Sequence, residues 1–242
     1  MKGLVLAAGQ AQRLRPLTAD LPKTLLPVAG DATILDLTLA NLHAVGIEEA
    51  VIVTGFAAER IEARAPELER RHGVRLELVH NDRPDWNNAY SLWIAREAFR
   101  GGALLVNGDT VHPVAVEERL LAARGPGLLL AVDDEKTLGD EEMKVLLSPD
   151  GDVQRINKAV DPPSAQGEYI GLTLIEPGAA EALAEALEAT WRRDTTLYYE
   201  DGFQAYVDAG GEARAASIGT VAWVEVDDHA DLARAREIAC PS

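Results

Sequence analysis

Lys2-Gly-Leu-Val-Leu-Ala-Ala8 is the stretch that decides the fold, and Gly9 follows it directly. The run is short and almost continuously apolar, as expected for a strand that is buried on both faces of a parallel sheet. From Thr33 to Val45 the apolar residues recur at helical spacing and stop at Gly46, after which Ala50 to Thr54 is a second apolar run. Together these segments predict one βαβ unit.

The same alternation continues through the first half of the chain. We predict a charged helix from Ala57 to Arg71, a strand from Val74 to Val79, a helix from Asn88 to Phe99 and a strand from Ala103 to Asn107. Strands that alternate with helices are typical of an α/β protein whose sheet is mostly parallel and whose crossovers are right-handed. The expected fold is therefore Rossmann-like, with helices flanking the sheet.

The pattern changes after the turn Gly125-Pro-Gly127. Short strands are predicted over 128–132, 144–147, 153–157 and 169–174, helices from Gly178 and Glu200, a last strand over 222–227 and a last helix over 228–239. We interpret the strands of this half as antiparallel additions that form a lid over the carboxyl edge of the sheet. No linker, repeat or low-complexity tract divides residues 1–242, so a single domain is expected.

The chain is strongly acidic, with a formal net charge of −17 at pH 7. This charge opposes binding to a nucleic-acid backbone or an anionic membrane, so neither is expected as a partner. No apolar run approaches the roughly 20 residues that span a bilayer, and the N-terminus lacks a leader pattern, so a cytoplasmic location is expected. The single cysteine, Cys240, provides neither a disulfide framework nor a zinc cluster.

The loop after the first strand reads Gly9-Gln-Ala-Gln-Arg-Leu-Arg-Pro-Leu-Thr18, and it stands where open α/β sheets bind phosphates. It has neither the Gly-Lys-Ser/Thr ending of a P-loop nor the three glycines of a dinucleotide fingerprint, which argues against an ATPase and an NAD-dependent dehydrogenase. Backbone amides of a tight loop together with Arg13 could instead hold β- and γ-phosphates. Lys23 could place a positive charge near the α-phosphate.

Four short motifs stand in and around this loop: Leu6-Ala-Ala-Gly9, Arg13-Leu14, Pro16-Leu-Thr18 and Pro22-Lys23. They resemble the opening of the sugar-phosphate nucleotidyltransferase, or pyrophosphorylase, superfamily. The resemblance implies that Leu6, Ala7, Ala8 and Gly9 bind the nucleotide and that Arg13 and Lys23 are catalytic. Either cation alone would be interpreted as an ordinary surface charge. The second glycine of the family's loop is Ala11 here, and we expect its methyl group to alter the loop geometry while binding is retained.

Two aspartates come directly after predicted strands, Asp109 in Asn107-Gly-Asp-Thr110 and Asp227 in Glu225-Val-Asp-Asp228. Carboxylates from distant strand ends can hold one Mg²⁺ beside substrate phosphates. The alternative is that each aspartate caps the following helix, which is an adequate role for Asp228. For Asp109 and Asp227 the resemblance implies the metal role, and therefore Mg²⁺ as the cofactor.

The segment Asn81-Asp-Arg-Pro-Asp-Trp-Asn-Asn-Ala-Tyr-Ser-Leu92 resembles a stretch of the cytidylyltransferases that act on phosphocholine and related phospho-alcohols or phosphonates. The resemblance implies CTP as the donor, with Asn81, Asn88 and Ser91 recognising its base and ribose. Amide side chains can bind the donor and acceptor edge of cytosine. Asn87 and Asn88 could equally cap the helix that follows, and both interpretations stay open.

Three motifs of the second half are Met143-Lys-Val145, Ile156-Asn-Lys158 and Gly167-Glu-Tyr-Ile-Gly171. They resemble the acceptor side of inositol-phosphate and aminoethylphosphonate cytidylyltransferases, which makes Lys144, Lys158 and Glu168 candidate acceptor contacts. Lysine is scarce in this chain, which favours the two lysines as clamps for an acceptor phosphate. Tyr198 is a further candidate, through a cation–π contact with an ammonium head group.

These features predict an Mg²⁺-dependent nucleotidyltransferase that joins CMP from CTP to a small phosphorylated alcohol or phosphonate, forms a CDP-conjugate and releases pyrophosphate. Residues 1–125 and 222–242 would form the nucleotide-binding core, and 126–221 mainly the acceptor-binding lid. The acidic run Asp133 to Glu142, with Trp191, Tyr199, Glu200 and Asp201, weakly favours a cationic acceptor. A sugar-1-phosphate nucleotidyltransferase and a non-catalytic, nucleotide-sensing regulatory subunit remain alternatives. The sequence leaves the acceptor and the oligomeric state open.

Overall fold

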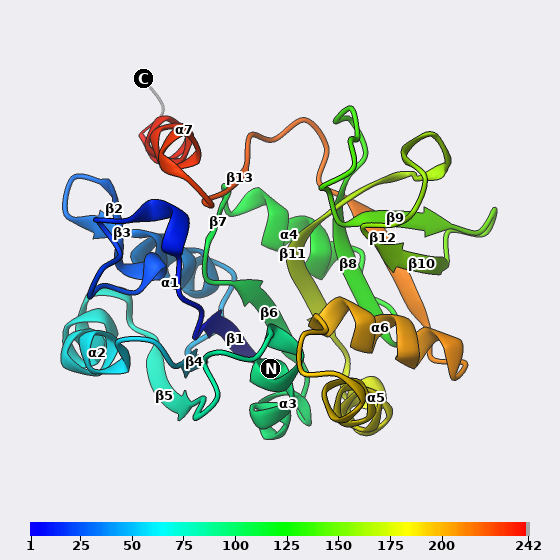
Figure 1. Cartoon of the computed structure of the whole chain (residues 1–242), viewed down its shortest axis with the longest axis horizontal. Coiled ribbons are helices and arrows are strands. Elements are labelled where there is room, and N and C mark those ends of the chain that lie inside the picture. The colour runs from blue at the N-terminus through cyan, green and yellow to red at the C-terminus, as the bar shows by residue number, and fades with distance from the viewer. Residues whose placement is uncertain (241–242) are drawn as a thin grey trace.

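The centre of the molecule is one nine-stranded sheet, shown in Figure 1 from the computed structural model, which describes residues 1–240. The sheet contains β1 (Lys2–Ala7), β4 (Glu49–Thr54), β5 (Arg75–His80), β6 (Ala103–Asn107), β8 (Leu128–Asp133), β9 (Lys144–Leu147), β10 (Val153–Asn157), β11 (Gly167–Ile175) and β12 (Ala213–Ser217). Its order is β10-β9-β11-β6-β1-β4-β5, and β8 joins β11 to β12. β1 pairs in parallel with β4 and β6, whereas β11 runs antiparallel to β6. The predicted mixed sheet with antiparallel additions is confirmed.

Helices connect and cover the strands. The α-helices are α1 (Ile34–Ala44), α2 (Ala58–His72), α3 (Asn88–Ile94), α4 (Ala115–Ala122), α5 (Ala180–Arg193), α6 (Tyr199–Asp208) and α7 (His229–Ala239). The short 3-10 helices are η1 (Gln12–Leu14), η2 (Lys23–Leu25), η3 (Arg96–Phe99), η4 (Pro162–Ser164) and η5 (Pro177–Ala179). Within residues 1–240, none of the helices has both the length and the apolar character needed to cross a membrane.

Each face of the sheet carries its own hydrophobic cluster. Neighbouring residues of a strand point to opposite faces, so Leu4 belongs to the cluster that packs against α3, α5 and α6. Val5 belongs to the cluster that packs against α1, α2 and α4. Burial on both faces explains why the first strand is continuously apolar instead of alternating.

Most predicted elements are present, with changes at their ends. The helix expected from Asn88 to Phe99 is α3 followed by η3, and the strand expected over 222–227 is only β13 (Val224–Glu225), which pairs with β7 (Thr110–Val111). The sequence patterns did not predict α4, β12 or the hairpin of β2 (Pro27–Ala29) and β3 (Ala32–Thr33). The β12 sequence, Ala213-Arg-Ala-Ala-Ser217, lacks the β-branched and aromatic residues that favour strands, and its pairing with β8 decides its conformation.

The carboxyl ends of β1, β4, β5, β6 and β8 meet at one edge of the sheet. β8 ends at this edge because both β6 and β8 run antiparallel to β11. The loop from Gly9, the segments that begin at Asn81 and Asp109, and the irregular segment 134–143 all leave the sheet here. β9, β10 and β11 extend the same sheet past β6. Open α/β sheets bind their ligands outside this edge.

Candidate active site

Three acidic and two basic side chains meet at the carboxyl edge. Asp109 follows β6, and the backbone N–H of Val226 donates to its carbonyl oxygen at 2.9 Å, which joins it to the segment after β13. Lys23 Nζ lies 2.7 Å from Asp109 Oδ2 and 3.1 Å from Asp227 Oδ1, and an Arg13 guanidinium nitrogen lies 2.7 Å from Asp227 Oδ2. The structure therefore brings together the four residues to which sequence analysis gave catalytic and metal roles.

A third carboxylate, that of Glu225, belongs to this cluster, and sequence analysis missed it. One oxygen from each of Asp109, Glu225 and Asp227 lies within 4.8 Å of the others. The signal was present in the sequence, because Glu225 and Asp227 are separated by one residue in an extended segment and so point to the same side. Val226, between them, points into the core and is fully buried.

The charges of these side chains depend on one another. Burial alone would lower the pKa of Lys23, but the charges of Asp109 and Asp227 outweigh burial and raise that pKa above its ordinary value. Burial likewise opposes ionisation of Asp227, yet Lys23 and Arg13 hold its pKa below the usual range. The Asp109 carboxylate, followed by burial, raises the pKa of Glu225 to about 8. An additional cation beside the three carboxylates would relieve their mutual repulsion.

The carboxylates suit a hard divalent cation. Asp109 Oδ1 is buried and accepts no hydrogen bond in the described part of the chain. Leaving a buried carboxylate oxygen unpaired costs about 1–3 kcal/mol, which coordination of a cation would offset. The donor set consists of oxygens alone, as Mg²⁺ and Ca²⁺ prefer. Asp109, Glu225 and Asp227 are thus the residues that could hold a metal.

A cavity of about 110 Å³ lies between the first loop and this cluster, lined by Leu6, Ala7, Gly9, Gln10, Ala11, Lys23, Thr24, Gly108 and Asp109. Gly108 is required at this place, because a Cβ atom there would lie 2.5 Å from the Leu6 carbonyl oxygen. Ala11 has φ −87° and ψ 75°, a conformation that does not require glycine. The loop geometry therefore accommodates the alanine that replaces the family's second glycine.

A second cavity of about 200 Å³ adjoins the first, and the two share Leu6, Gly9 and Asp109. Its other lining residues are Ala8, Asn81, Pro84, Trp86, Asn87, Asn88, Ser91, Asn107 and Glu225. The predicted nucleotide-binding residues are therefore distributed around two adjoining cavities. Ala7 lies in the first cavity, while Ala8, Asn81, Asn88 and Ser91 lie in the second.

The amide side chains around the second cavity already make protein hydrogen bonds. Asn81 is buried, donates to Ser91 Oγ at 2.9 Å and accepts from the Arg83 backbone at 2.7 Å. Asn87 caps α3, in agreement with the alternative that sequence analysis left open. Asn88 accepts from the Tyr199 backbone at 2.8 Å and so ties α3 to α6. These amides shape the wall of the cavity.

The predicted acceptor contacts do not form one group. Lys144 is completely buried, and its Nζ donates to the carbonyl oxygens of Gly139, Asp140 and Glu142 at 3.0, 3.0 and 3.2 Å, which uses all three of its N–H groups. Its ammonium thus closes the preceding loop and has no donor left for an acceptor phosphate.

Lys158, Tyr198 and Glu168 occupy two other places. Lys158 Nζ lies 5.9 Å from the centre of the Tyr198 ring, and Tyr198 is exposed. Glu168 is buried and pairs with Lys136 at 2.6 Å. Trp191, considered as an ammonium contact, instead packs against Trp93, with ring centres 5.0 Å apart.

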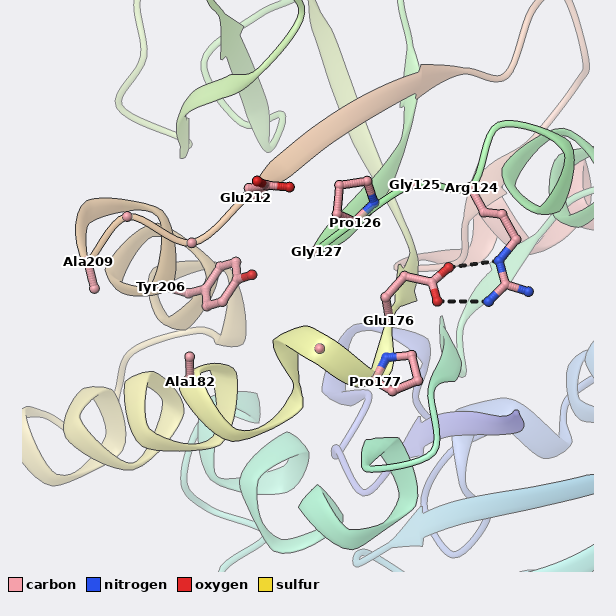
Figure 2. Close-up of a pocket in the computed structure, with 13 residues that line it drawn as sticks. Arg124, Gly125, Pro126, Gly127, Glu176, Pro177, Ala182, Tyr206, Ala209 and Glu212 are labelled. Carbon is pink, nitrogen blue, oxygen red and sulfur yellow. Dashed lines mark hydrogen bonds and ion pairs between the residues drawn. The ribbon is translucent and has the colours of Figure 1, made fainter.

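A further cavity lies away from this site. It lies beside α5 and α6, where β8 and β12 begin, and Figure 2 shows the residues that line it. Its volume is about 800 Å³. Its principal charges, Arg124 and Glu176, neutralise each other through two hydrogen bonds of 2.8 and 2.7 Å. Parallel strands begin at the opposite edge of the sheet from where they end, so this cavity is separated from the carboxylates.

Comparisons with known proteins agree with this geometry. Residues 2–127 match the family described as nucleotidyl transferase. CMP-5'-(3-aminopropyl)phosphonate synthase of Streptomyces rubellomurinus is 34% identical over 97% of this chain and 38% of that protein. Glucose-1-phosphate thymidylyltransferase of Streptomyces griseus is 30% identical over 96% of this chain and 64% of its own length. The chain thus spans less than two thirds of these two relatives.

The solved structure of the inositol-1-phosphate CTP transferase from T. maritima superposes with a TM-score of 0.81 and 21% identity, covering 99% of this chain and 98% of that one. At this identity the likeness establishes the fold. The family match covers more than half of the chain and includes the first loop, Lys23 and Asp109. The chain belongs to the nucleotidyl transferase family.

Proposed function

We propose that this chain transfers a cytidylyl group from CTP to a small phosphorylated alcohol or phosphonate. The observation that carries the proposal is the pair of adjoining cavities, which share Asp109 and lie on the Lys23 side and on the Asn81 to Ser91 side of it. One cavity offers loop backbone and Lys23 for phosphates, and the other is lined by amide side chains suited to a nucleoside. The names of the phosphonate and inositol-phosphate relatives support cytidine as the base.

In the proposed reaction, an acceptor oxygen attacks the α-phosphorus of CTP in line with the leaving group. The bond from the α-phosphorus to the bridging oxygen breaks, and pyrophosphate leaves with that oxygen. The acceptor needs no general base, because a phosphomonoester with a second pKa of about 6 is already largely dianionic at neutral pH. Catalysis then depends on alignment and on stabilisation of charge.

The residues of this chain have distinct roles in the proposal. Lys23 and Arg13 stabilise the charge of the transferring phosphates, and the loop from Gly9 orients them. Asp109, Glu225 and Asp227 would hold Mg²⁺, which would supply positive charge to offset the negative charge of the donor phosphates. Lys158 and Tyr198 are proposed contacts for the acceptor. We further propose that the chain acts as a single domain, with its acceptor side in residues 126–221.

The proposal is tested by measuring pyrophosphate release over a grid of donors and acceptors. CTP, UTP, dTTP and GTP would each be combined with phosphocholine, 2-aminoethylphosphonate, inositol 1-phosphate and glucose 1-phosphate. Turnover should be greatest with CTP and one of the first three acceptors. Greatest turnover with dTTP and glucose 1-phosphate would instead establish the sugar-nucleotide alternative, and no release from any pair would favour a nucleotide-sensing subunit.

A further inference from the structure

Glu225 lines a third cavity in addition to the nucleotide cavity. This space of about 390 Å³ is bounded by Asp133, Lys136, Glu168, Arg234 and the segment 221–225. Asp133 and Glu168 stand opposite each other on paired strands, so both side chains belong to one face of the sheet. Tyr169, the next residue on β11, packs on the other face against Tyr199 and Phe203. The third cavity therefore approaches the metal-binding carboxylates from the face opposite α6.

An ammonium group already lies in this cavity, and it belongs to Lys136. Its Nζ lies 2.6 Å from Glu168 Oε2 and 3.3 Å from Glu142 Oε1. It also lies 5.7 Å from the centre of the Trp223 ring. The indole is held in place because its Nε1 donates to Asp133 Oδ2 at 2.7 Å. An indole face and two carboxylates can bind a primary ammonium ion, through a cation–π contact and charged hydrogen bonds.

The surroundings favour a cation, although the cation need not be Lys136. Glu168 is buried, and burial raises its pKa even though Lys136 opposes that change. A buried carboxylate without a cation would be strongly unfavourable. The side chain of Lys136, however, is 41% exposed and lies on the irregular segment 134–143, most of which is exposed. Its ammonium can therefore move out into solvent by rotation of its own side chain, while Lys144 keeps the backbone of the segment in place.

We propose that this cage, formed by Glu168, Glu142 and Trp223, binds the primary ammonium end of the acceptor, and that Lys136 occupies it until that ammonium displaces it. This inference rests on the proposed function, and it places the ammonium end of the acceptor in the cage instead of beside Tyr198, which is the N-cap of α6. Glu225 belongs both to the lining of the third cavity and to the metal-binding carboxylates, so an acceptor that reaches both would carry an amine at one end and a phosphate or phosphonate at the other. A neutral polyol ring could not replace the ion pair with Glu168.

Two variants with opposite expected effects test the proposal, with 3-aminopropylphosphonate and n-propylphosphonate as matched acceptors. Glu168→Gln preserves the shape of the cage and removes its charge, so KM for 3-aminopropylphosphonate should rise by about tenfold or more. Lys136→Met removes the internal competitor, so the same KM should fall by roughly three- to tenfold. Neither variant should change KM for n-propylphosphonate or for CTP.

The control is Lys2→Met, since Lys2 pairs with Glu77 at the amino end of the sheet and should not affect either acceptor. Two results would contradict the cage without contradicting cytidylyl transfer. One is an equal KM for the two acceptors in the wild type, and the other is a change in KM in Lys136→Met that is the same for both acceptors. Absence of transfer to any acceptor would instead reject the proposed function.

As a second measurement, n-propylammonium should inhibit competitively against 3-aminopropylphosphonate, and more strongly in Lys136→Met. Non-competitive or absent inhibition would contradict the assignment.

Discussion

At the scale of single residues, Glu225 is a member of the candidate site that the structure reveals and that the sequence patterns did not predict. Its carboxylate completes the group formed with Asp109 and Asp227. We expect Glu225→Gln to weaken Mn²⁺ or Mg²⁺ binding by about tenfold or more, because a side chain that can ionise when the metal binds is replaced by one of equal size that cannot. Titration calorimetry with Mn²⁺ measures this loss, and Glu176→Gln, in the remote cavity, serves as the control. Unchanged metal affinity would remove Glu225 from the site.

Lys23 is the second residue whose role can be separated from the fold. Its ammonium contacts Asp109 and Asp227, so in the proposed reaction it would compete with a metal for these carboxylates and would stabilise the phosphates. Lys23→Met should lower kcat by roughly 10²- to 10³-fold and leave metal affinity equal or greater. We therefore expect kcat to fall while the affinity for the metal ion is kept. A defect confined to the acceptor KM would show that Lys23 binds the acceptor.

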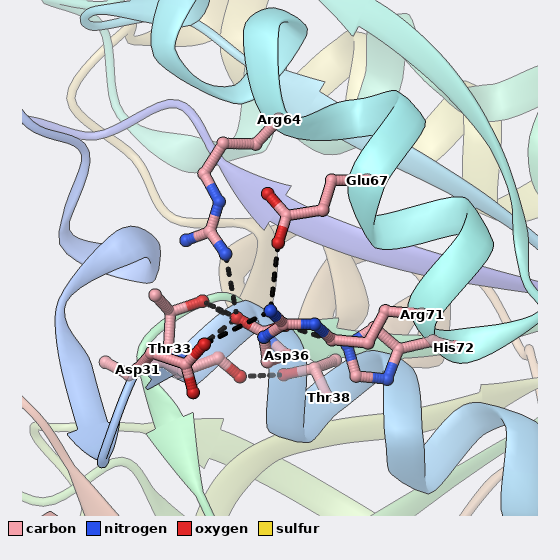
Figure 3. Close-up of polar contacts among 9 residues, drawn as sticks. Asp31, Thr33, Asp36, Thr38, Arg64, Glu67, Arg71 and His72 are labelled. Atoms are coloured by element: carbon pink, nitrogen blue, oxygen red, sulfur yellow. Dashed lines mark hydrogen bonds and ion pairs between the residues drawn. The ribbon is translucent and has the colours of Figure 1, made fainter.

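At the scale of elements, α1 and α2 are joined through one buried carboxylate. Figure 3 shows Asp36 of α1, which accepts from the Thr33 hydroxyl at 2.6 Å and faces Arg64, Arg71 and His72 of α2. Burial opposes ionisation of Asp36, but hydrogen bonds from Thr33 and His72 outweigh burial and lower its pKa to about 2. Ionised Asp36 therefore stabilises the fold above its unfolded pKa of about 3.9, and this stabilisation is lost as pH falls through about 2.

Asp36→Asn tests whether the Asp36 carboxylate stabilises the packing of α1 against α2. The substitution should reduce the free energy of unfolding at pH 7 by about 2–4 kcal/mol, because two arginines and a histidine lose their common partner. Urea denaturation at several pH values should show the difference from wild type narrowing as the pH approaches 2. Asp31→Asn is the matched control, since Asp31 is exposed and contacts only Arg71 among the basic residues described. A difference that is constant with pH would contradict the role of Asp36 ionisation.

Elements with strong local patterns could be predicted from the sequence, and those that depend on distant partners could not. The buried strands β1, β4 and β6 are evident as apolar runs, and α1 has both helical spacing and a capping box at Thr33. β12 becomes a strand only by pairing with β8. Lys144 stands in a motif that indicates an acceptor contact, yet its N–H groups donate to carbonyl oxygens of the preceding loop. Neither the pairing of a strand with a distant segment nor the closure of a loop by a side chain leaves a periodic signal in the sequence.

At the scale of the whole molecule, the strongly acidic chain concentrates its site cations at one edge of the sheet. CTP with Mg²⁺ should therefore bind the folded state and not the unfolded state. At a free CTP concentration of a hundred times Kd, this binding should raise the free energy of unfolding by about 2.7 kcal/mol. For a chain of this size the melting temperature should rise by roughly 5–10 °C. EDTA should abolish most of the rise. An equal rise with CTP in the presence of EDTA would show that the carboxylates do not hold a metal needed for nucleotide binding.

Cytidylyl transfer itself is tested most directly by following the phosphorus atoms. ³¹P NMR of the protein with CTP, Mg²⁺ and 3-aminopropylphosphonate should show the CTP signals replaced by pyrophosphate and by a new pair of coupled resonances from the CMP–phosphonate linkage. The two products should appear in equal amounts, and Asp109→Asn should form neither at a comparable rate. Pyrophosphate accompanied by free CMP alone, or no change in the spectrum with any of the acceptors named above, would contradict the transferase assignment.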